Sequence, residues 1–186
     1  MKRLSLPCLL AVCILFPLSA RSYAQSAPTA PMPGHTQPGH AHLPAAPSTS
    51  LALSIDGKVT TLSVADLQAM PQKTLTVHNE HTKKDETYTG VSLPALLAKY
   101  GAPFDKAGEK KIFHSYLRVE GTDHYFVLYS GSEVQSEIHN AEVLVALSID
   151  GKPLGEDGQI KLVASGDKRP ARWVRNLSGI TLVTVQ

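Results

Sequence analysis

The amino-acid sequence predicts an α+β fold that is built mainly from short strands. Short apolar runs are separated by turn-forming dipeptides, of which Asp56-Gly57 and Asp150-Gly151 are the clearest. The stretches with helical character are few and short. Strands and helices do not alternate strictly along the chain, so the pattern favours a mixed sheet over a parallel βαβ arrangement.

The first elements are predicted from turn and capping residues. Asp56-Gly57 tolerates the positive φ angles of a tight turn, so residues 51–55 and 58–62 are expected to form a hairpin. A short helix is expected to begin at Ser63, because a capping hydroxyl there is followed by Asp66 at the third position.

The clearest helix is expected over residues 92–101. Ser92 is predicted to cap it, Pro94 suits its first turn, and Gly101 is suited to its end. The remaining alternating or apolar runs predict strands at 73–78, 86–89, 116–120, 125–130, 143–149, 159–164 and 179–185, with a short polar helix at 132–139.

Two N-terminal segments are predicted to precede the folded part. A basic start, an apolar run at 4–18 and small residues before Ala24 indicate a signal peptide over residues 1–24, cleaved after Ala24. Residues 25–50 hold six prolines and no Asp, Glu, Lys or Arg, which predicts a disordered Pro/His-rich linker. We therefore expect a periplasmic or secreted protein with one domain at 51–186.

Charge and hydropathy limit the partners. Removing residues 1–24 leaves 15 basic residues against 16 acidic ones, so no net positive field favours nucleic acid. No later segment is apolar enough to predict a membrane span.

Three segments in order, residues 88–97, 143–154 and 162–174, carry a family resemblance. They are an aromatic-x-Gly-Val-x-Leu-x-x-Leu-Leu run, a Leu-x-Ala run leading to Asp-Gly-x-Pro-Leu, and a Gly-to-Arg-Trp-Val segment. Together they resemble the molybdopterin-binding domain of sulfite-oxidase-type oxidoreductases. The resemblance implies the compact mixed-sheet core of the sulfite oxidase molybdopterin-binding fold, an oxidoreductase activity and a molybdopterin cofactor.

The chain departs from that family at the metal ligand. The family holds molybdenum through a cysteine thiolate on the strand upstream of the Gly-Val segment. Here Cys8 and Cys13 are the only cysteines and both lie in the expected signal peptide; the corresponding strand offers His78 and His81. Imidazole does not replace a soft thiolate. The sequence therefore predicts either a degenerate member of the oxidoreductase family or a non-catalytic periplasmic accessory module that binds an anion, a metal ion or a protein.

Candidate binding residues lie in the closing basic segment. By the resemblance, Lys168, Arg169 and Arg172 are predicted to hold an oxyanion or the phosphate of the pterin, with His78 as a further cofactor-binding candidate. The alternative is that Arg172 is paired with acids such as Asp167 and has a structural role. No nucleophile–base pair is recognisable, so no catalytic residue is predicted.

A second candidate site lies in the linker. His35, His40 and His42 could bind copper, nickel or zinc weakly, since imidazole suits these ions. The alternative is a polar tether whose histidines have no ligand.

Overall fold

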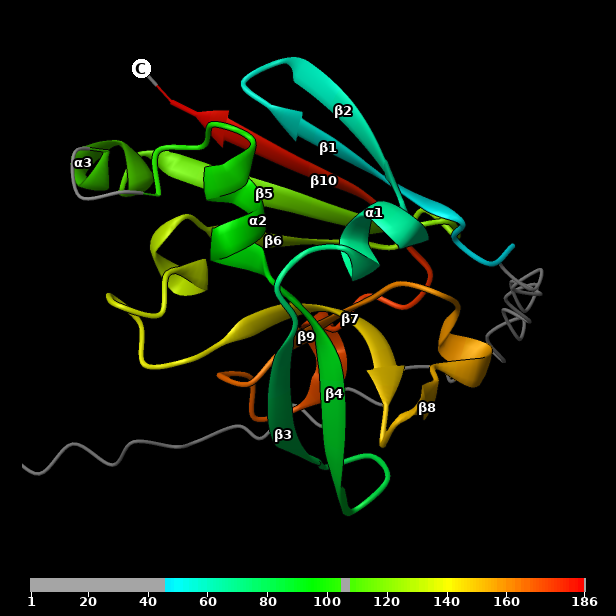
Figure 1. Cartoon of the computed structure of the whole chain (residues 1–186). Coiled ribbons are helices and arrows are strands. Elements are labelled where there is room, and N and C mark those ends of the chain that lie inside the picture. The colour runs from blue at the N-terminus through cyan, green and yellow to red at the C-terminus, as the bar shows by residue number, and fades with distance from the viewer. Residues whose placement is uncertain (1–45, 105–107, 186) are drawn as a thin grey trace, which may run out of the picture. The chain divides into compact units, whose positions relative to one another are not determined.

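The computed structural model describes residues 46–104 and 108–185. The predictions for the signal peptide, for most of the linker and for His35, His40 and His42 lie outside the described residues. Within them, strands dominate and the helices are few and short, so the α+β prediction is confirmed (Figure 1).

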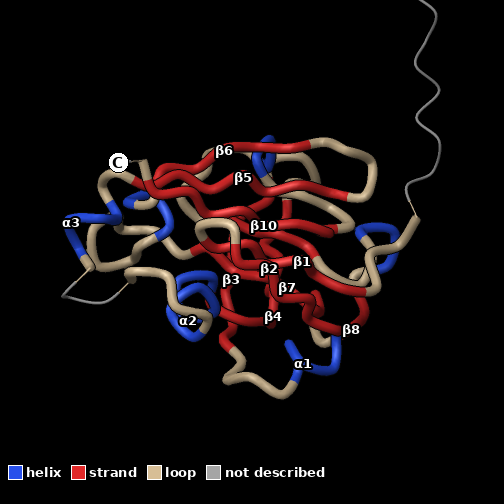
Figure 2. The backbone as a smooth tube through the Cα atoms, turned by 90° about the horizontal axis from the view of Figure 1, so that it is seen from above, coloured by secondary structure: helices blue, strands red, loops and turns tan. Residues whose placement is uncertain are grey.

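Two five-stranded sheets, named sheet A and sheet B, form the fold. Sheet A has the order β2-β1-β10-β5-β6 (Figure 2) and contains β1 (Ser50–Ile55), β2 (Lys58–Ser63), β5 (Ser115–Gly121), β6 (Phe126–Ser130) and β10 (Leu177–Thr184). Sheet B has the order β3-β4-β7-β8, with β9 also paired to β7, and contains β3 (Lys73–Asn79), β4 (Lys84–Ser92), β7 (Val143–Ile149), β8 (Lys152–Pro153) and β9 (Lys161–Ala164). Strands β1 and β10 pair in parallel and the other ladders are antiparallel.

Short helices connect the strands. They are α1 (Val64–Gln68), α2 (Leu93–Lys99), α3 (Glu109–Ile112) and the 3-10 turns η1 (Ser132–Val134), η2 (Gly155–Asp157) and η3 (Pro170–Arg172). None of the helices in the described part is long and apolar enough to cross a membrane.

The local predictions hold where turn and cap chemistry decides the backbone. Asp56 and Gly57 both have positive φ, and the hairpin β1–β2 forms around them. Ser63 and Asp66 form the predicted capping box at α1. At α2, Ser92 occupies the predicted cap position, but its side chain makes no capping hydrogen bond.

The polar helix predicted over 132–139 is shorter than expected. Only η1 is helical there, and the chain continues in turns. The amide of Ser130, just before η1, donates to the carboxylate of Glu133 at 2.7 Å, so this amide is bonded to a side chain. A polar segment with little apolar surface to bury has no packing face to extend it into a full helix.

The two sheets bury one continuous apolar cluster between them. Gly90 fixes how closely β4 and β7 approach, since a Cβ at this position would lie 2.1 Å from the carbonyl oxygen of Val145. A register shift follows between Thr89 and Gly90. The glycine of the Gly-Val pattern is therefore required by packing.

Candidate functional site

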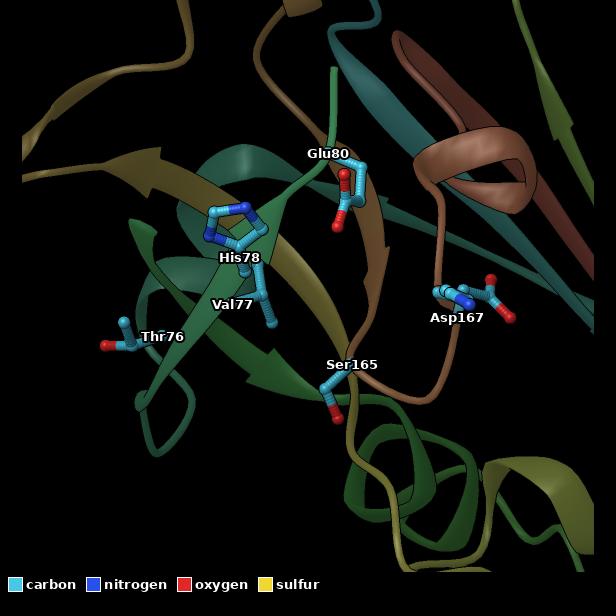
Figure 3. Close-up of a pocket in the computed structure, with 7 residues that line it drawn as sticks. Thr76, Val77, His78, Glu80, Ser165 and Asp167 are labelled. Carbon is cyan, nitrogen blue, oxygen red and sulfur yellow. The ribbon is translucent and has the colours of Figure 1, made fainter. Parts of the chain in front are cut away.

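An open pocket of about 300 Å³ lies between the end of β3 and the segment that follows β9 (Figure 3). It is lined by Thr76, Val77, His78, Glu80, Ser165, Asp167 and Lys168. Two of the predicted binding residues, His78 and Lys168, are thus brought to one site from positions ninety residues apart in sequence. Arg169 and Arg172 do not line it.

The β3 side of the pocket is lined by both faces of this edge strand. Val77 is buried, Thr76 and His78 are exposed on the other face, and all three line the pocket. Nδ1 of His78 lies 2.8 Å from Oδ1 of Asp85, its direct partner across the β3–β4 ladder. Nε2 is left as the second hydrogen-bonding atom of the ring.

Glu80 closes the same end of the pocket. Its carboxylate accepts from the ammonium of Lys83 at 2.5 Å. This hydrogen bond is the main cause that holds the pKa of Glu80 below its ordinary value, and the charge of Arg169 adds to the effect. Glu80 is therefore ionised at neutral pH and contributes a negative charge to the pocket.

The opposite wall of the pocket, residues 165–168, is fixed by two hydrogen bonds between Ser165 and Glu142. The amide of Ser165 donates to the carbonyl of Glu142 at 2.9 Å, and the amide of Glu142 donates to Oγ of Ser165 at 2.8 Å. Because Oγ accepts in this bond, the hydroxyl hydrogen of Ser165 remains able to donate to a ligand. The ammonium of Lys168 is exposed and makes no ion pair with any residue that the structure describes.

Arg172 is paired with two carboxylates. Its guanidinium donates to Asp167 at 3.1 and 2.5 Å and to Glu133 at 2.9 Å, and it lies over the ring of Tyr129. The hydrogen bond that Arg172 donates to Asp167 is the first cause that raises the pKa of Arg172. The pairing with Asp167 given as the alternative in the sequence analysis is therefore present, and ligand binding by Arg172 stays a prediction that would require this pairing to break.

Gly166 lies just before the basic residues of this segment. A Cβ on Gly166 would lie 2.8 Å from Ala141 and 3.1 Å from His139, so this glycine packs closely against the segment before β7. Arg169 is exposed at the start of η3, next to the pocket residue Lys168.

A buried polar network behind the pocket was not predicted from the sequence. Glu86 accepts from the hydroxyl of Tyr88 at 2.6 Å, from Asn79 at 2.9 Å and from Thr82 at 2.8 Å. Lys161, which is only 5% exposed, continues the network by donating to the Tyr88 oxygen at 3.0 Å.

Lys161 also reaches the carboxylate of Asp157 at 2.6 Å and lies over the rings of Tyr88 and Trp173. These two rings meet edge to face, with centroids 5.9 Å apart. The available signals were Glu86 and Tyr88 two residues apart on a strand and a lysine inside the apolar run 160–164. Neither signal identifies which residues Glu86, Tyr88 and Lys161 contact.

The pKa values in the network follow from burial and hydrogen bonding. Burial alone would raise the pKa of Glu86, but the bonds from Tyr88, Asn79 and Thr82 outweigh it and hold the value below the ordinary one. Burial, reinforced by the bond to Glu86, raises the pKa of Tyr88. At neutral pH the network therefore contains a carboxylate and a neutral phenol.

The residues around the pocket do not fit molybdopterin with its metal. The lining supplies hydroxyls, an imidazole, an ammonium and the carboxylates of Glu80 and Asp167, but no sulfur ligand. Glu80 opposes an anionic cofactor, and the cluster of Arg172 with Asp167 and Glu133 has two carboxylates against one guanidinium, so it adds no positive charge to attract one. Among the described residues there is also no cluster of three or more His, Cys, Asp or Glu side chains suited to a metal ion.

Comparison with known proteins finds a shared fold. The chain is similar to the crystal structure of the sulfane dehydrogenase SoxCD from Paracoccus pantotrophus, with a TM-score of 0.55 and 18% sequence identity. The match covers 72% of this chain and 37% of that chain, so this chain spans well under half of its length. No family model matches the chain, and no curated protein matches it. At this identity the likeness shows the fold alone.

Proposed function

We propose that this chain is a non-catalytic binding module of the sulfite-oxidase-type fold, which takes a small oxyanion in the pocket between β3 and residues 165–168. The observation that carries the proposal is the state of the charges around the pocket. Arg172 is neutralised by its carboxylate partners, whereas the ammonium of Lys168 is unpaired among the described residues and lines the pocket.

The donors around Lys168 suit an oxyanion. The hydroxyl of Ser165 lies in the same lining and can donate to sulfur or phosphorus oxygens, whereas the hydroxyl of Thr76 is engaged with that of Thr87 at 3.0 Å. His78 donates from Nδ1 to the carboxylate of Asp85, so Nε2 of the neutral ring is an acceptor and could bond only to a protonated oxygen of the ligand, such as that of hydrogen phosphate. A charge-assisted bond from one ammonium with neutral donors beside it is an ordinary way to hold such a group.

The acids in the lining limit the ligand. Glu80 and Asp167 repel a second cluster of negative charge, so a small anion is favoured over a polyphosphate or a large cofactor. The pocket is open to solvent, and screening there weakens each charge contact. We therefore expect modest affinity that falls as the salt concentration rises.

The binding test uses sulfite, sulfate and phosphate as probes. Backbone amide signals of residues 76–80 and 165–168 are followed by NMR as each anion is added in a chloride background. We expect saturable shifts in wild type, lost in Lys168→Gln and kept in Lys152→Gln, which removes the same charge from an exposed strand. Absence of saturation for all three anions, or equal loss in both variants, contradicts the proposal.

The competing function is an oxidoreductase, which the likeness to a dehydrogenase favours. It is tested by purifying the chain from a molybdenum-sufficient host and measuring bound metals by mass spectrometry and pterin by fluorescence. Stoichiometric molybdenum and pterin would overturn the binding module. Absence of both from a sample that still binds the anion supports it.

The proposal places the module outside the inner membrane. The support is the N-terminal sequence, with its basic start and apolar run before Ala24. Mass spectrometry of the protein from a periplasmic fraction is expected to give Gln25 as the first residue. A chain that retains Met1 in the cytoplasm contradicts this part of the proposal.

A further inference from the structure

Strand β6 forms one edge of sheet A and differs from other strands at the sheet ends. Figure 2 shows it at the margin of the sheet, beside β5. The other end strands β2, β3 and β8 each contain a lysine, namely Lys58, Lys73 and Lys152. Natural edge strands usually carry such charges or a proline, which discourage pairing with another chain. The sequence of β6, Phe-Val-Leu-Tyr-Ser, has neither.

The outward side chains of β6 are large and apolar. Phe126 is 50% exposed and Leu128 is 53% exposed, while Val127 between them is buried. Both lie on the outer face of sheet A, because alternate residues of a strand point to opposite faces. Tyr116 on β5 adds a second exposed ring to the same face, opposite Ser130.

The backbone of β6 is also available for pairing. The amide of Gly121 donates to the carbonyl of Tyr125, which places odd-numbered residues of the strand in the bonds to β5. The amide and carbonyl groups of Phe126 and Leu128 therefore point to the open edge. No bond from these four groups to a residue outside the ladder is found in the described chain.

The charges on this face are self-complementary. Arg118 is the cross-strand neighbour of Leu128, and Glu120 is the neighbour of Phe126. Arg118 and Glu120 form an ion pair, and the guanidinium lies over the Phe126 ring. This face of β5 and β6 thus carries one cation and one anion. A two-fold rotation would place Arg118 of one copy on the same row as Glu120 of the other copy.

From this geometry we infer that β6 is a homodimer interface, in which two copies pair their β6 strands antiparallel about a two-fold axis through Val127. In this register Phe126 lies opposite Leu128 of the partner subunit, and each pair exchanges two backbone hydrogen bonds. Each row across the joined sheets then runs from a cation to an anion: Arg118, Leu128, Phe126 of the partner subunit and Glu120 of the partner subunit.

Neighbouring registers are less favourable. Moving the axis toward the C-terminal end would require the amide of Ser130, which already donates to Glu133 at 2.7 Å. Moving it the other way would require His124, whose φ of 64° belongs to a turn. The linker is a poor occupant of the edge, because its six prolines lack the amide hydrogens that a ladder needs.

The contact is small compared with a standard interface, so the dimer is expected to dissociate on dilution. Sedimentation velocity and light scattering of the purified chain are run from micromolar concentrations to about 0.5 mM, a range that covers weak complexes. A dimer at the upper end is expected. A monomer throughout, or open-ended assemblies, overturns the inference, since pairing through one edge closes at two copies.

Two lysine variants locate the interface. Leu128→Lys removes both Phe–Leu cross-strand pairs and is expected to weaken the dimer by about tenfold or more. Val59→Lys is the matched control, because Val59 is 64% exposed on β2 at the opposite edge of the same sheet. A dimer that survives Leu128→Lys, or one that is lost equally in both variants, contradicts the inference.

Cross-linking tests the register. In a background with Cys8 and Cys13 replaced by serine, Phe126→Cys and Leu128→Cys are prepared separately and then mixed. Random pairing of equal amounts gives about twice as much mixed disulfide as either homodimer. Because residues directly opposite are closer than diagonal ones, the mixed disulfide should exceed this twofold ratio clearly. A ratio of about two or less overturns the proposed register.

Discussion

Replacing Glu86 by glutamine tests whether the buried network behind the pocket stabilises the fold. The Glu86 side chain is buried and receives three donors, from Tyr88, Asn79 and Thr82. Glutamine has almost the same shape but offers one oxygen and one NH2 group. At least one of the three donors would then face an NH2 group or lose its partner. We expect Glu86→Gln to fold and to be clearly less stable than wild type at neutral pH.

The magnitude follows from the bonds lost. A hydrogen bond to a charged, buried acceptor contributes about 1.5–3 kcal/mol, and an unsatisfied buried donor adds to the cost. One or two such bonds are lost, depending on which oxygen becomes nitrogen. The expected decrease in the free energy of unfolding is therefore about 2–4 kcal/mol.

The effect should depend on pH in a defined direction. The pKa of Glu86 is lower in the folded chain than in the unfolded one, so its contribution is complete above the unfolded value of about 4.3. As the pH falls from there through the folded pKa, the carboxylate is protonated and the contribution disappears. The difference between wild type and Glu86→Gln should therefore shrink in acid.

Urea denaturation followed by Trp173 fluorescence measures both effects, at pH 7 and at a series of values below 5. Glu80→Gln is the matched control, since Glu80 forms an exposed pair with Lys83 and should leave the unfolding midpoint unchanged within error. The reasoning is refuted if Glu86→Gln behaves like the control at pH 7. It is also refuted if the loss stays constant on acidification.

Two further variants test packing and capping. Gly90→Ala should lower the free energy of unfolding by more than about 2 kcal/mol, the cost of forced overpacking, because its methyl group would meet the Val145 carbonyl. Gly179→Ala is the control, since a Cβ there has its nearest neighbour 4.0 Å away, and it should cost far less in the same thermal unfolding assay. Ser63→Ala should cost about 1 kcal/mol by removing the cap of α1, and a midpoint equal to that of wild type would show that the capping bond to Asp66 is energetically silent.

The sequence predicted those elements whose backbone is decided by nearby residues. Asp150-Gly151 has positive φ at both positions, as its composition predicts, and β7 ends there over the expected range 143–149. Strand bounds elsewhere were displaced by a few residues, and β4 extends well beyond the expected 86–89. Long-range pairing with β7 supports residues 90–92, while residues 84–85 pair with β3; local propensity carries no information about the pairing with β7.

The candidate site was predicted less well for the same reason. The basic segment identified Lys168 and Arg172 as cations, but not that Glu133, thirty-nine residues away, neutralises one of them. Likewise, Lys161 interrupts an apolar strand in the sequence, and only the structure shows that its ammonium is bonded to Tyr88 and Asp157. Charge counts alone could not distinguish a structural cation from one that is available to a ligand.

Lys161 is held by the chain's own residues, whereas Lys168 lines the pocket without an ion pair to any described residue. Here Tyr88, Trp173 and Lys161 pack against one another, and the carboxylates of Glu86 and Asp157 complete their hydrogen bonds. We therefore expect this network to stabilise the fold without any contribution from Lys168. Lys168 can therefore change with the ligand while the fold remains, which is why its substitution should affect anion binding and leave the unfolding transition in place.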